Sequence, residues 1–186
     1  MKRLTPLIII TLVVIALASC TSAEPASDGW QTHEYEELGV TFELPEGWAV
    51  QETEQLINIA NTAEGLSGET VPEVGASITL VGIEEFDGYS EPRDLLGFFM
   101  DYFEYGRGDT LERIGDPELT TIQNLPAATV AYDGAVRGNT GRYTAAVIVS
   151  GERVALVFTM ASSVGNQYQK TLERFTESVF VRAPGE

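Results

Sequence analysis

The chain has 186 residues with 11 basic and 28 acidic side chains, one cysteine and one histidine, and a formal net charge of −17. Such an acidic surface repels nucleic acid and anionic lipid headgroups, so the composition argues against a nucleic-acid-binding protein. The single cysteine and single histidine also exclude a disulfide framework and a zinc site made of the usual histidine and cysteine ligands.

The first twenty residues have the pattern of an export signal. Two basic residues precede an uncharged, mostly apolar run from Leu4 to Ala18, which is short for a helix that must span a bilayer. The run ends in Leu-Ala-Ser-Cys at 17–20, which resembles the lipobox of bacterial lipoproteins. We therefore predict that residues 1–19 are a lipoprotein signal peptide and that Cys20 carries a diacylglycerol anchor with palmitate-type chains. The alternative is an ordinary signal peptide, or an uncleaved anchor, with a chance cysteine.

A lipidated Cys20 would hold the mature chain on the extracytoplasmic face of a membrane in the cell envelope, because two or three acyl chains make a lasting anchor. Residues 20–29 are small, polar and rich in helix breakers, which predicts a flexible tether. Residues 30–182 then have the length of one domain. Since Lys2 and Arg3 are the only charged residues before Cys20, the mature chain keeps nine basic and 28 acidic side chains. This surface favours cationic partners, or it simply keeps the domain soluble.

The first half of the domain has the period-two pattern of strands. Apolar and polar residues alternate from Val40 to Leu44, and a turn signal, Pro45-Glu46-Gly47, follows directly. An extended run resumes at Trp48, and the stretch 65–75, rich in glycine and proline, indicates a surface loop. Two further strands are predicted at Gln55–Ala60 and Ala76–Ile83.

A helix is predicted to begin at Ser90-Glu91-Pro92, which combine a capping hydroxyl, an early acid and a first-turn proline, and to run to Tyr105, before Gly106. Its apolar residues cover about 220° of the helical wheel, whereas packing on a sheet needs a stripe of little more than about 100°. Part of this flank is therefore either covered by the loop at 65–75 or exposed. If it is exposed, the candidate interaction surface is formed by Phe98, Met100 and Phe103.

The last third of the domain predicts a meander and a closing helix. Connections of only a few residues, each with a glycine, join three strands, and connections that short link antiparallel neighbours. A helix is expected over about Asn166–Ser178, because Tyr168, Leu172, Phe175 and Val179 form a narrow apolar stripe. The order of elements predicts an α+β fold with an antiparallel sheet. The three meander strands are Ala128–Val136, Arg142–Val149 and Arg153–Met160.

The run Gly39-Val40-Thr41-Phe42-Glu43-Leu44-Pro45-Glu46-Gly47-Trp48 resembles the opening G-[IV]-x-[FIV]-x-x-P-x-x-W of PsbP-like domains, which include mycobacterial LpqN-type lipoproteins. The order of the later helices and strands agrees over nearly all of the mature domain. The resemblance implies an antiparallel sheet of about six strands with helices on both faces, an α/β/α sandwich. It implies a non-catalytic accessory or binding role, as in an extrinsic subunit of photosystem II, and it carries over no site residue.

Few residues point to catalysis. His33 is expected to be a solvated linker residue, and there is no serine-nucleophile motif, P-loop or dinucleotide fingerprint. Gly134, Gly138 and Gly141 are spaced by turns, not as in a strand-to-helix loop that binds phosphate. Paired carboxylates could bind Ca²⁺ or hydrolyse a glycoside, yet no loop has the calcium-ligand series. The acidic clusters are Glu34/Glu36/Glu37, Glu84/Glu85/Asp87 and Asp101/Glu104.

We therefore predict a membrane-anchored, non-catalytic binding or accessory module that needs no metal or cofactor and contacts a membrane-protein complex. Two alternatives stay open: a carboxylate-based hydrolase of an envelope saccharide or peptide, and a carrier of a small apolar ligand or cation. A deep cleft holding two carboxylates about 5–9 Å apart would favour the hydrolase. A shallow aromatic patch would favour the module.

Overall fold

The computed structural model describes residues 29–67, 72–86, 88–106, 110–136, 138–163 and 165–185, with backbone only for 102–106. The predicted signal peptide, Cys20 and the tether therefore lie outside the described residues. None of the helices within the described ranges is long and apolar enough to cross a membrane.

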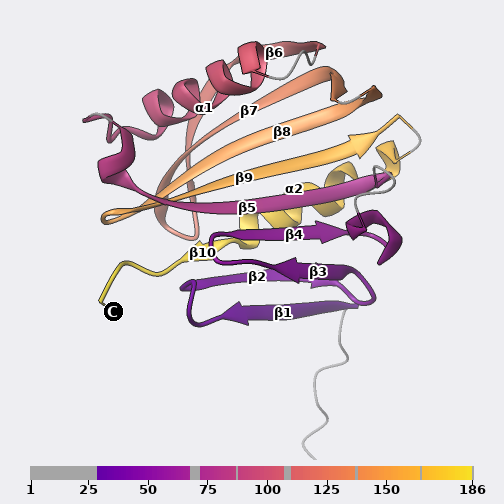
Figure 1. The fold of residues 1–186 in the computed structure, drawn as a ribbon, viewed down its shortest axis with the longest axis horizontal. Helices are drawn as coiled ribbons and strands as arrows, with labels where there is room; N and C mark the ends of the chain where they lie inside the picture. Colours follow the sequence, from indigo (N-terminus) through magenta and orange to yellow (C-terminus); the bar gives the residue numbers. More distant parts are fainter. Residues whose placement is uncertain are drawn as a thin grey trace, which may run out of the picture.

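The described chain forms two antiparallel sheets and two main helices (Figure 1). The larger sheet has the strand order β3-β4-β5-β9-β8-β7-β6, and the smaller has the order β1-β2-β10. The expectation of about six strands in one sheet is corrected accordingly. The larger sheet comprises β3 (Ala49–Glu52), β4 (Leu56–Ala60), β5 (Val74–Gly82), β6 (Thr110–Ile122), β7 (Leu125–Val136), β8 (Asn139–Ser150) and β9 (Arg153–Ser162). The smaller comprises β1 (Trp30–Tyr35), β2 (Val40–Pro45) and β10 (Phe180–Val181).

The helices agree closely with their predicted positions. The first, α1, spans Pro92–Gly106 and follows a short 3-10 turn, η2, at Ile83–Phe86. The second begins as a 3-10 turn, η3, at Asn166–Tyr168 and continues as α2 over Gln169–Ser178. A further 3-10 turn, η1, lies at Glu64–Leu66. The predicted meander corresponds to β7, β8 and β9, which pair in sequence order.

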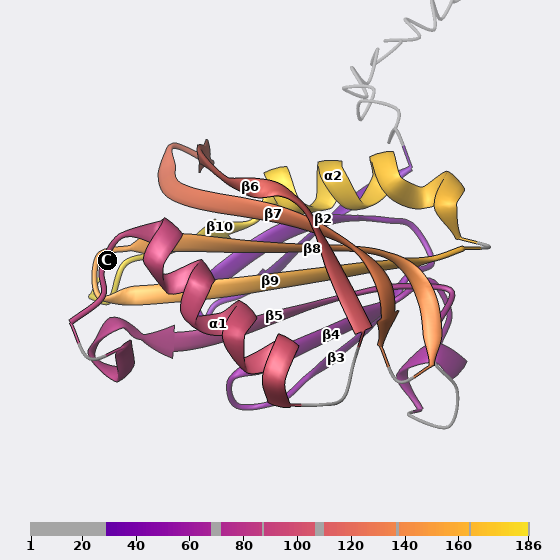
Figure 2. The same ribbon diagram turned by 90° about the horizontal axis from the view of Figure 1, so that it is seen from above.

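Two apolar clusters form on opposite faces of the larger sheet, because successive side chains of a strand point to opposite faces. Along β8, Tyr143 and Ala145 pack in a cluster that includes Leu95 and Leu96 of α1. Ala146 and Ile148 of the same strand point to the opposite face and pack in a second cluster with α2 and the smaller sheet. Figure 2 shows α1 and α2 separated by the strands of the larger sheet. The second cluster includes Ala146, Ile148, Val157, Phe175, Val179, Val40, Phe42 and Leu44.

Arg153 of β9 connects the two sheets. Its Nη1 donates a hydrogen bond of 2.8 Å to the carbonyl of Leu38, just before β2, and lies 3.4 Å from the carbonyl of Arg182, just after β10. The backbone of Arg182 in turn donates to the carbonyl of Gly39 at 2.8 Å. One side chain therefore ties two strands of the smaller sheet, at one end of that sheet, to the larger sheet.

Strand β6 is an edge strand that the sequence pattern does not predict. Ten of its residues are exposed, so the period-two pattern of apolar residues is absent. Its pairing with β7 shifts register between Ile114 and Glu118, where Gly115 has a φ of +76° and Pro117 cannot donate a backbone hydrogen bond. A bulge at an edge strand accommodates both residues without breaking the sheet.

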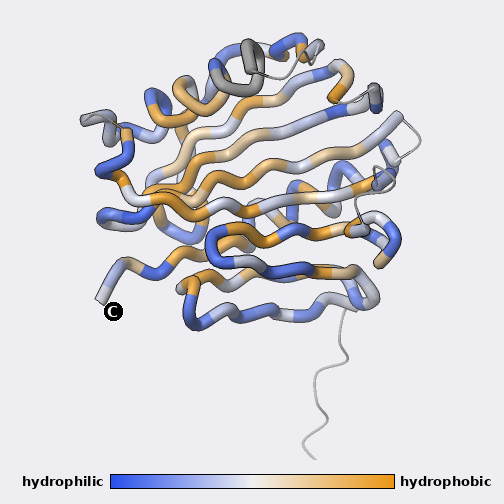
Figure 3. The backbone as a smooth tube through the Cα atoms, viewed as in Figure 1, coloured by the Kyte–Doolittle hydropathy of each residue, from blue (hydrophilic) through white to orange (hydrophobic). Residues whose placement is uncertain are grey.

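His33 lies within β1 rather than in a linker, so that expectation is wrong. Figure 3 shows why β1 was not predicted, since most of this strand is hydrophilic. The His33 ring stacks on Phe42, with centroids 5.6 Å apart and planes 10° apart, and burial lowers the pKa of His33 from its usual 6.5. The ring acts here as a flat packing surface for the smaller sheet.

The lowered pKa of His33 predicts a small pH dependence of stability. The folded state favours the neutral ring, so the unfolded chain takes up the proton first as the pH falls. The contribution of the neutral His33 ring to the free energy of unfolding is complete above about pH 6.5 and is lost as the pH falls below that value. We expect a lower melting temperature at about pH 5.5 than at about pH 7.5, and a smaller difference for His33→Phe, measured by circular dichroism. Equal differences for both proteins would contradict this assignment.

Candidate functional site

The three residues of the predicted interaction surface have different positions. Phe98 is 48% exposed, whereas Met100 is only 4% exposed and belongs to the apolar cluster beneath α1. Met100 is therefore a core residue, which corrects its assignment to the surface. The side chain of Phe103 lies outside the described residues. Of the three, Phe98 is the one that the structure places on an open flank.

The aromatic flank of α1 is covered in part by η2. Phe86 is 2% exposed, and its ring lies edge-on to Phe98 at 5.5 Å and to Phe99 at 5.2 Å. The loop at 65–75 was the expected cover, but its first described residues lie beside β4, where Gly65 approaches Ala60. The apolar surface of α1 is wider than packing on the sheet requires. Its additional described part is divided between an aromatic cluster with Phe86 and an exposed edge at Phe98.

That exposed edge borders a groove between α1 and β6, which we call the α1–β6 groove. Its volume is about 430 Å³, and its two aromatic walls are Phe98 and Tyr89, which is 49% exposed. Three carboxylates and two guanidinium groups share the groove, so both signs of charge are present with one negative charge in excess. These charged residues are Asp94, Asp101, Asp116, Arg93 and Arg113.

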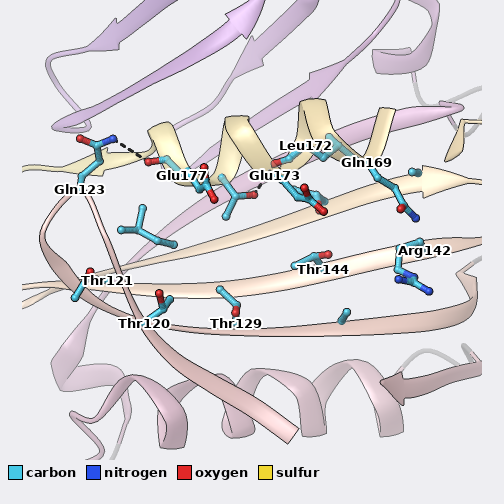
Figure 4. A pocket seen from close by; sticks show the side chains of 15 residues that line it. Thr120, Thr121, Gln123, Thr129, Arg142, Thr144, Gln169, Leu172, Glu173 and Glu177 are labelled. Carbon is cyan, nitrogen blue, oxygen red and sulfur yellow. Dashed lines mark hydrogen bonds between the residues drawn. The ribbon is translucent and has the colours of Figure 1, made fainter. Parts of the chain in front are cut away.

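A second pocket lies beside α2, on the opposite face of the sheet from α1. Its volume is about 500 Å³, and Figure 4 shows α2 along one side and strands β6 to β9 along the other. We call it the α2 pocket. The strands contribute Thr120, Thr121, Ile122, Thr129, Ala131, Arg142, Thr144, Thr159 and Ala161, with Gln123 from the β6–β7 turn. The helix contributes Gln169, Leu172, Glu173, Thr176 and Glu177.

The α2 pocket is lined by more negative than positive charge. Arg142 donates from Nε to Asp133 Oδ1 at 2.6 Å and from Nη2 to Oδ2 at 3.1 Å, and this hydrogen bonding raises the pKa of Arg142. The charge of Arg142 on β8 is therefore neutralised by Asp133, which lies opposite it on β7. Glu173 and Glu177 are the carboxylates that line the pocket, so its net character is acidic.

The position of Glu173 and Glu177 does not suit glycoside hydrolysis. The pair is four residues apart on one helix, so both carboxylates lie along the same wall. A glycosidase needs its two carboxyl groups on either side of the scissile bond. The facing wall supplies threonine hydroxyls, which are neither acids nor bases of useful strength at neutral pH.

The described members of the acidic clusters do not converge on a metal site. Within the described ranges, no three histidine, cysteine or carboxylate side chains converge closely enough to hold an ion. Glu34 instead accepts from Arg182 Nη2 at 3.3 Å, and Glu84 and Glu85 lie in η2. Asp87 and the Glu104 side chain lie outside the described residues.

The α2 pocket was missed because its residues come from four strands and a helix. Along β7, the residues that line the pocket alternate with residues that face α1, as do those along β8. The available signal was that threonine and alanine alternate with the residues that face α1 along this predicted meander, with the charged residues Asp133 and Arg142 near the β7–β8 turn. Only the fold shows that α2 borders this face.

No protein-family model matches the sequence, and no curated protein matches it. Solved structures with the same fold include cyanobacterial PsbP (CyanoP) from Synechocystis, with a TM-score of 0.62 at 16% identity over 89% of this chain and 98% of that chain. LpqN, involved in cell envelope biogenesis of Mycobacterium tuberculosis, has a TM-score of 0.55 at 13% identity over 82% of this chain and 90% of that chain. A protein of unknown function from Pseudomonas aeruginosa has a TM-score of 0.50 at 13% identity over 83% of this chain and 98% of that chain. At such identities the likeness concerns the fold, and the described domain has a PsbP-like fold.

Proposed function

We propose that the protein is a lipid-anchored, extracytoplasmic binding module without catalytic activity, which contacts a partner protein through the α1–β6 groove. The fold is shared with LpqN, a protein involved in cell envelope biogenesis, and with cyanobacterial PsbP. These likenesses support an accessory role in the cell envelope. The proposal treats the domain as an α/β/α sandwich with one helix on each face.

The anchor would be the lipid on Cys20, and the tether would leave the α1–β6 groove accessible. Nine residues separate Cys20 from Trp30, and an extended chain covers at most about 3.5 Å per residue, or roughly 30 Å. In Figure 1, β1 and α1 lie at opposite ends of the stacked elements. A domain held by its β1 end therefore presents α1 away from the bilayer.

The observation that carries the proposal is the pair of half-exposed aromatic rings, Tyr89 and Phe98, in a groove with three carboxylates. Aromatic residues concentrate binding energy at protein interfaces, and their faces attract cations. The acidic excess of the groove and of the whole chain favours a partner segment with a basic side chain. Arg93 and Arg113 would pair with acidic residues at the edge of the same segment.

The test is capture of the partner from native membranes with the intact lipoprotein, mild crosslinking and mass spectrometry. We expect a stoichiometric partner with the unchanged protein and loss of that partner with the double variant Tyr89→Ser/Phe98→Ser. The matched control is Phe180→Ser, since Phe180 is 37% exposed and lies in β10, away from α1. Unchanged capture by the double variant, or no partner with the intact protein, would overturn the proposal.

A further inference from the structure

We propose that the α2 pocket binds an uncharged, hydroxyl-rich ligand, of the size and chemistry of a short neutral oligosaccharide. This inference does not depend on the α1–β6 groove, because the two sites lie on opposite faces of the larger sheet. The pocket volume of about 500 Å³ falls within the range of small-molecule sites. Its lining, rather than its size, defines the class of ligand.

The polar groups of the pocket both donate and accept hydrogen bonds. Thr129 and Thr144 stand on neighbouring strands below α2 in Figure 4, with Thr120 on the next strand. A threonine hydroxyl has one donor and two acceptor positions, and a glutamine amide has both kinds of atom. A ligand hydroxyl has the same dual character. A lining of this kind therefore matches a series of hydroxyl groups.

The charges of the pocket disfavour anionic ligands. Among the described lining residues the cation is Arg142, which is held by Asp133 through two hydrogen bonds, whereas Glu173 and Glu177 place two carboxylates along the α2 wall. Phosphates and carboxylates would be repelled by these two side chains. Carboxylate oxygens accept hydrogen bonds from neutral hydroxyls, and such charge-assisted bonds are stronger than neutral ones.

The apolar atoms of the floor match the C–H faces of a sugar ring. Thr159, Thr144 and Ala131 lie side by side in register on β9, β8 and β7. Alanine and threonine methyl groups thus form a flat strip between the hydroxyls, and Leu172 of α2 closes one side. A ring with hydroxyls at its edge and carbons on its face meets both kinds of surface.

Several polar side chains of the pocket are oriented before any ligand arrives. Gln123 Nε2 donates to the Glu177 carbonyl at 2.8 Å, and Gln169 Nε2 donates to Asn166 Oδ1 at 2.6 Å. The Thr176 hydroxyl donates to the Leu172 carbonyl at 2.9 Å. Side chains fixed in this way lose little conformational freedom when a ligand binds.

The test measures binding of three probes, chitotriose, maltotriose and mannotriose, to the full-length protein in a detergent without a sugar headgroup. Saturation-transfer NMR and calorimetry would be used, with glucose 6-phosphate as the anionic comparison. Thr144→Val and Thr129→Val remove hydroxyls at nearly constant shape, and each should weaken binding by about tenfold. Thr79→Val is the matched control, because Thr79 lies opposite Leu156 on the other face of the sheet.

Binding of at least one trisaccharide, weakened by the two pocket variants and unchanged by Thr79→Val, would support the proposal. Ala131→Phe provides a second test, since it fills the pocket and should abolish binding without removing a hydroxyl. Absence of binding by all three probes, tighter binding of glucose 6-phosphate, or equal binding by all variants would overturn it. Each variant is first shown to be folded by circular dichroism, and capture of a protein partner through the α1–β6 groove should stay unchanged.

Discussion

Replacing Phe175 with alanine is expected to lower the free energy of unfolding by about 3–5 kcal/mol. Phe175 is fully buried in α2, and its ring lies edge-on to Phe42 of β2 with centroids 5.6 Å apart. The same cluster contains Ala146 and Val157 of the larger sheet. The ring thus contacts the point where helix, larger sheet and smaller sheet meet, and its loss would leave a cavity that none of them can fill.

Urea unfolding followed by tryptophan fluorescence and by far-ultraviolet circular dichroism would measure the effect of Phe175→Ala. Trp30 lies in β1 of the smaller sheet and Trp48 lies edge-on to Tyr168 just before α2, so fluorescence reports on these two regions, whereas circular dichroism reports on the whole fold. The control is Phe180→Ala, which removes a ring that is 37% exposed and should change stability by less than about 1 kcal/mol. A similar decrease in the free energy of unfolding for both variants would contradict the role of Phe175 in holding α2, the larger sheet and the smaller sheet together.

The parts of the fold that could be predicted are those in which local sequence and final environment agree. The meander was predicted because β7, β8 and β9 are joined by short links containing Gly138 and Gly151, which have φ values of +82° and +59°. Helix α1 was predicted because Pro92 and the residues before it form a start signal, and its apolar residues recur at helical spacing. In these elements the local residue pattern is compatible with one kind of secondary structure.

The parts that could not be predicted depend on neighbours distant in sequence. Strand β6 has ten exposed residues and contains Pro117, so only its pairing with β7 makes it a strand. The division into two sheets likewise depends on β10, which pairs with β2 across about 140 residues of chain. Met100 and Phe98 share one apolar flank in sequence, yet the packing of η2 and the sheet buries one and exposes the other.

Gly134 falls within the predicted strand Ala128–Val136 and Gly141 in the link before the predicted strand Arg142–Val149, yet the two glycines lie opposite each other within β7 and β8. Figure 2 shows these strands bending sharply toward one end of the sheet. A Cβ on Gly134 would collide with the carbonyl of Thr110 and lie 2.9 Å from Leu111 Cα, both on β6. A Cβ on Gly141 would collide with the carbonyl of Ala161 and lie 2.8 Å from Ser162 Cα, both on β9. The bend therefore requires glycine on both strands.

Gly134→Ala is accordingly expected to lower the free energy of unfolding by about 2–5 kcal/mol, because it adds backbone strain at a φ of +152° to the collision with β6. Gly141→Ala should cost about 1–3 kcal/mol, since β8 is held between two strands and cannot move aside. Gly97→Ala is the matched control: Gly97 lies exposed in α1 with open space where its Cβ would be, so alanine should stabilise the helix by about 0.5–1 kcal/mol. Urea midpoints would rank the three variants. If Gly134→Ala and Gly141→Ala unfold at the same urea concentration as the unchanged protein, the bend at this end of the sheet does not depend on glycine, and the curvature must come from the side chains packed against α1.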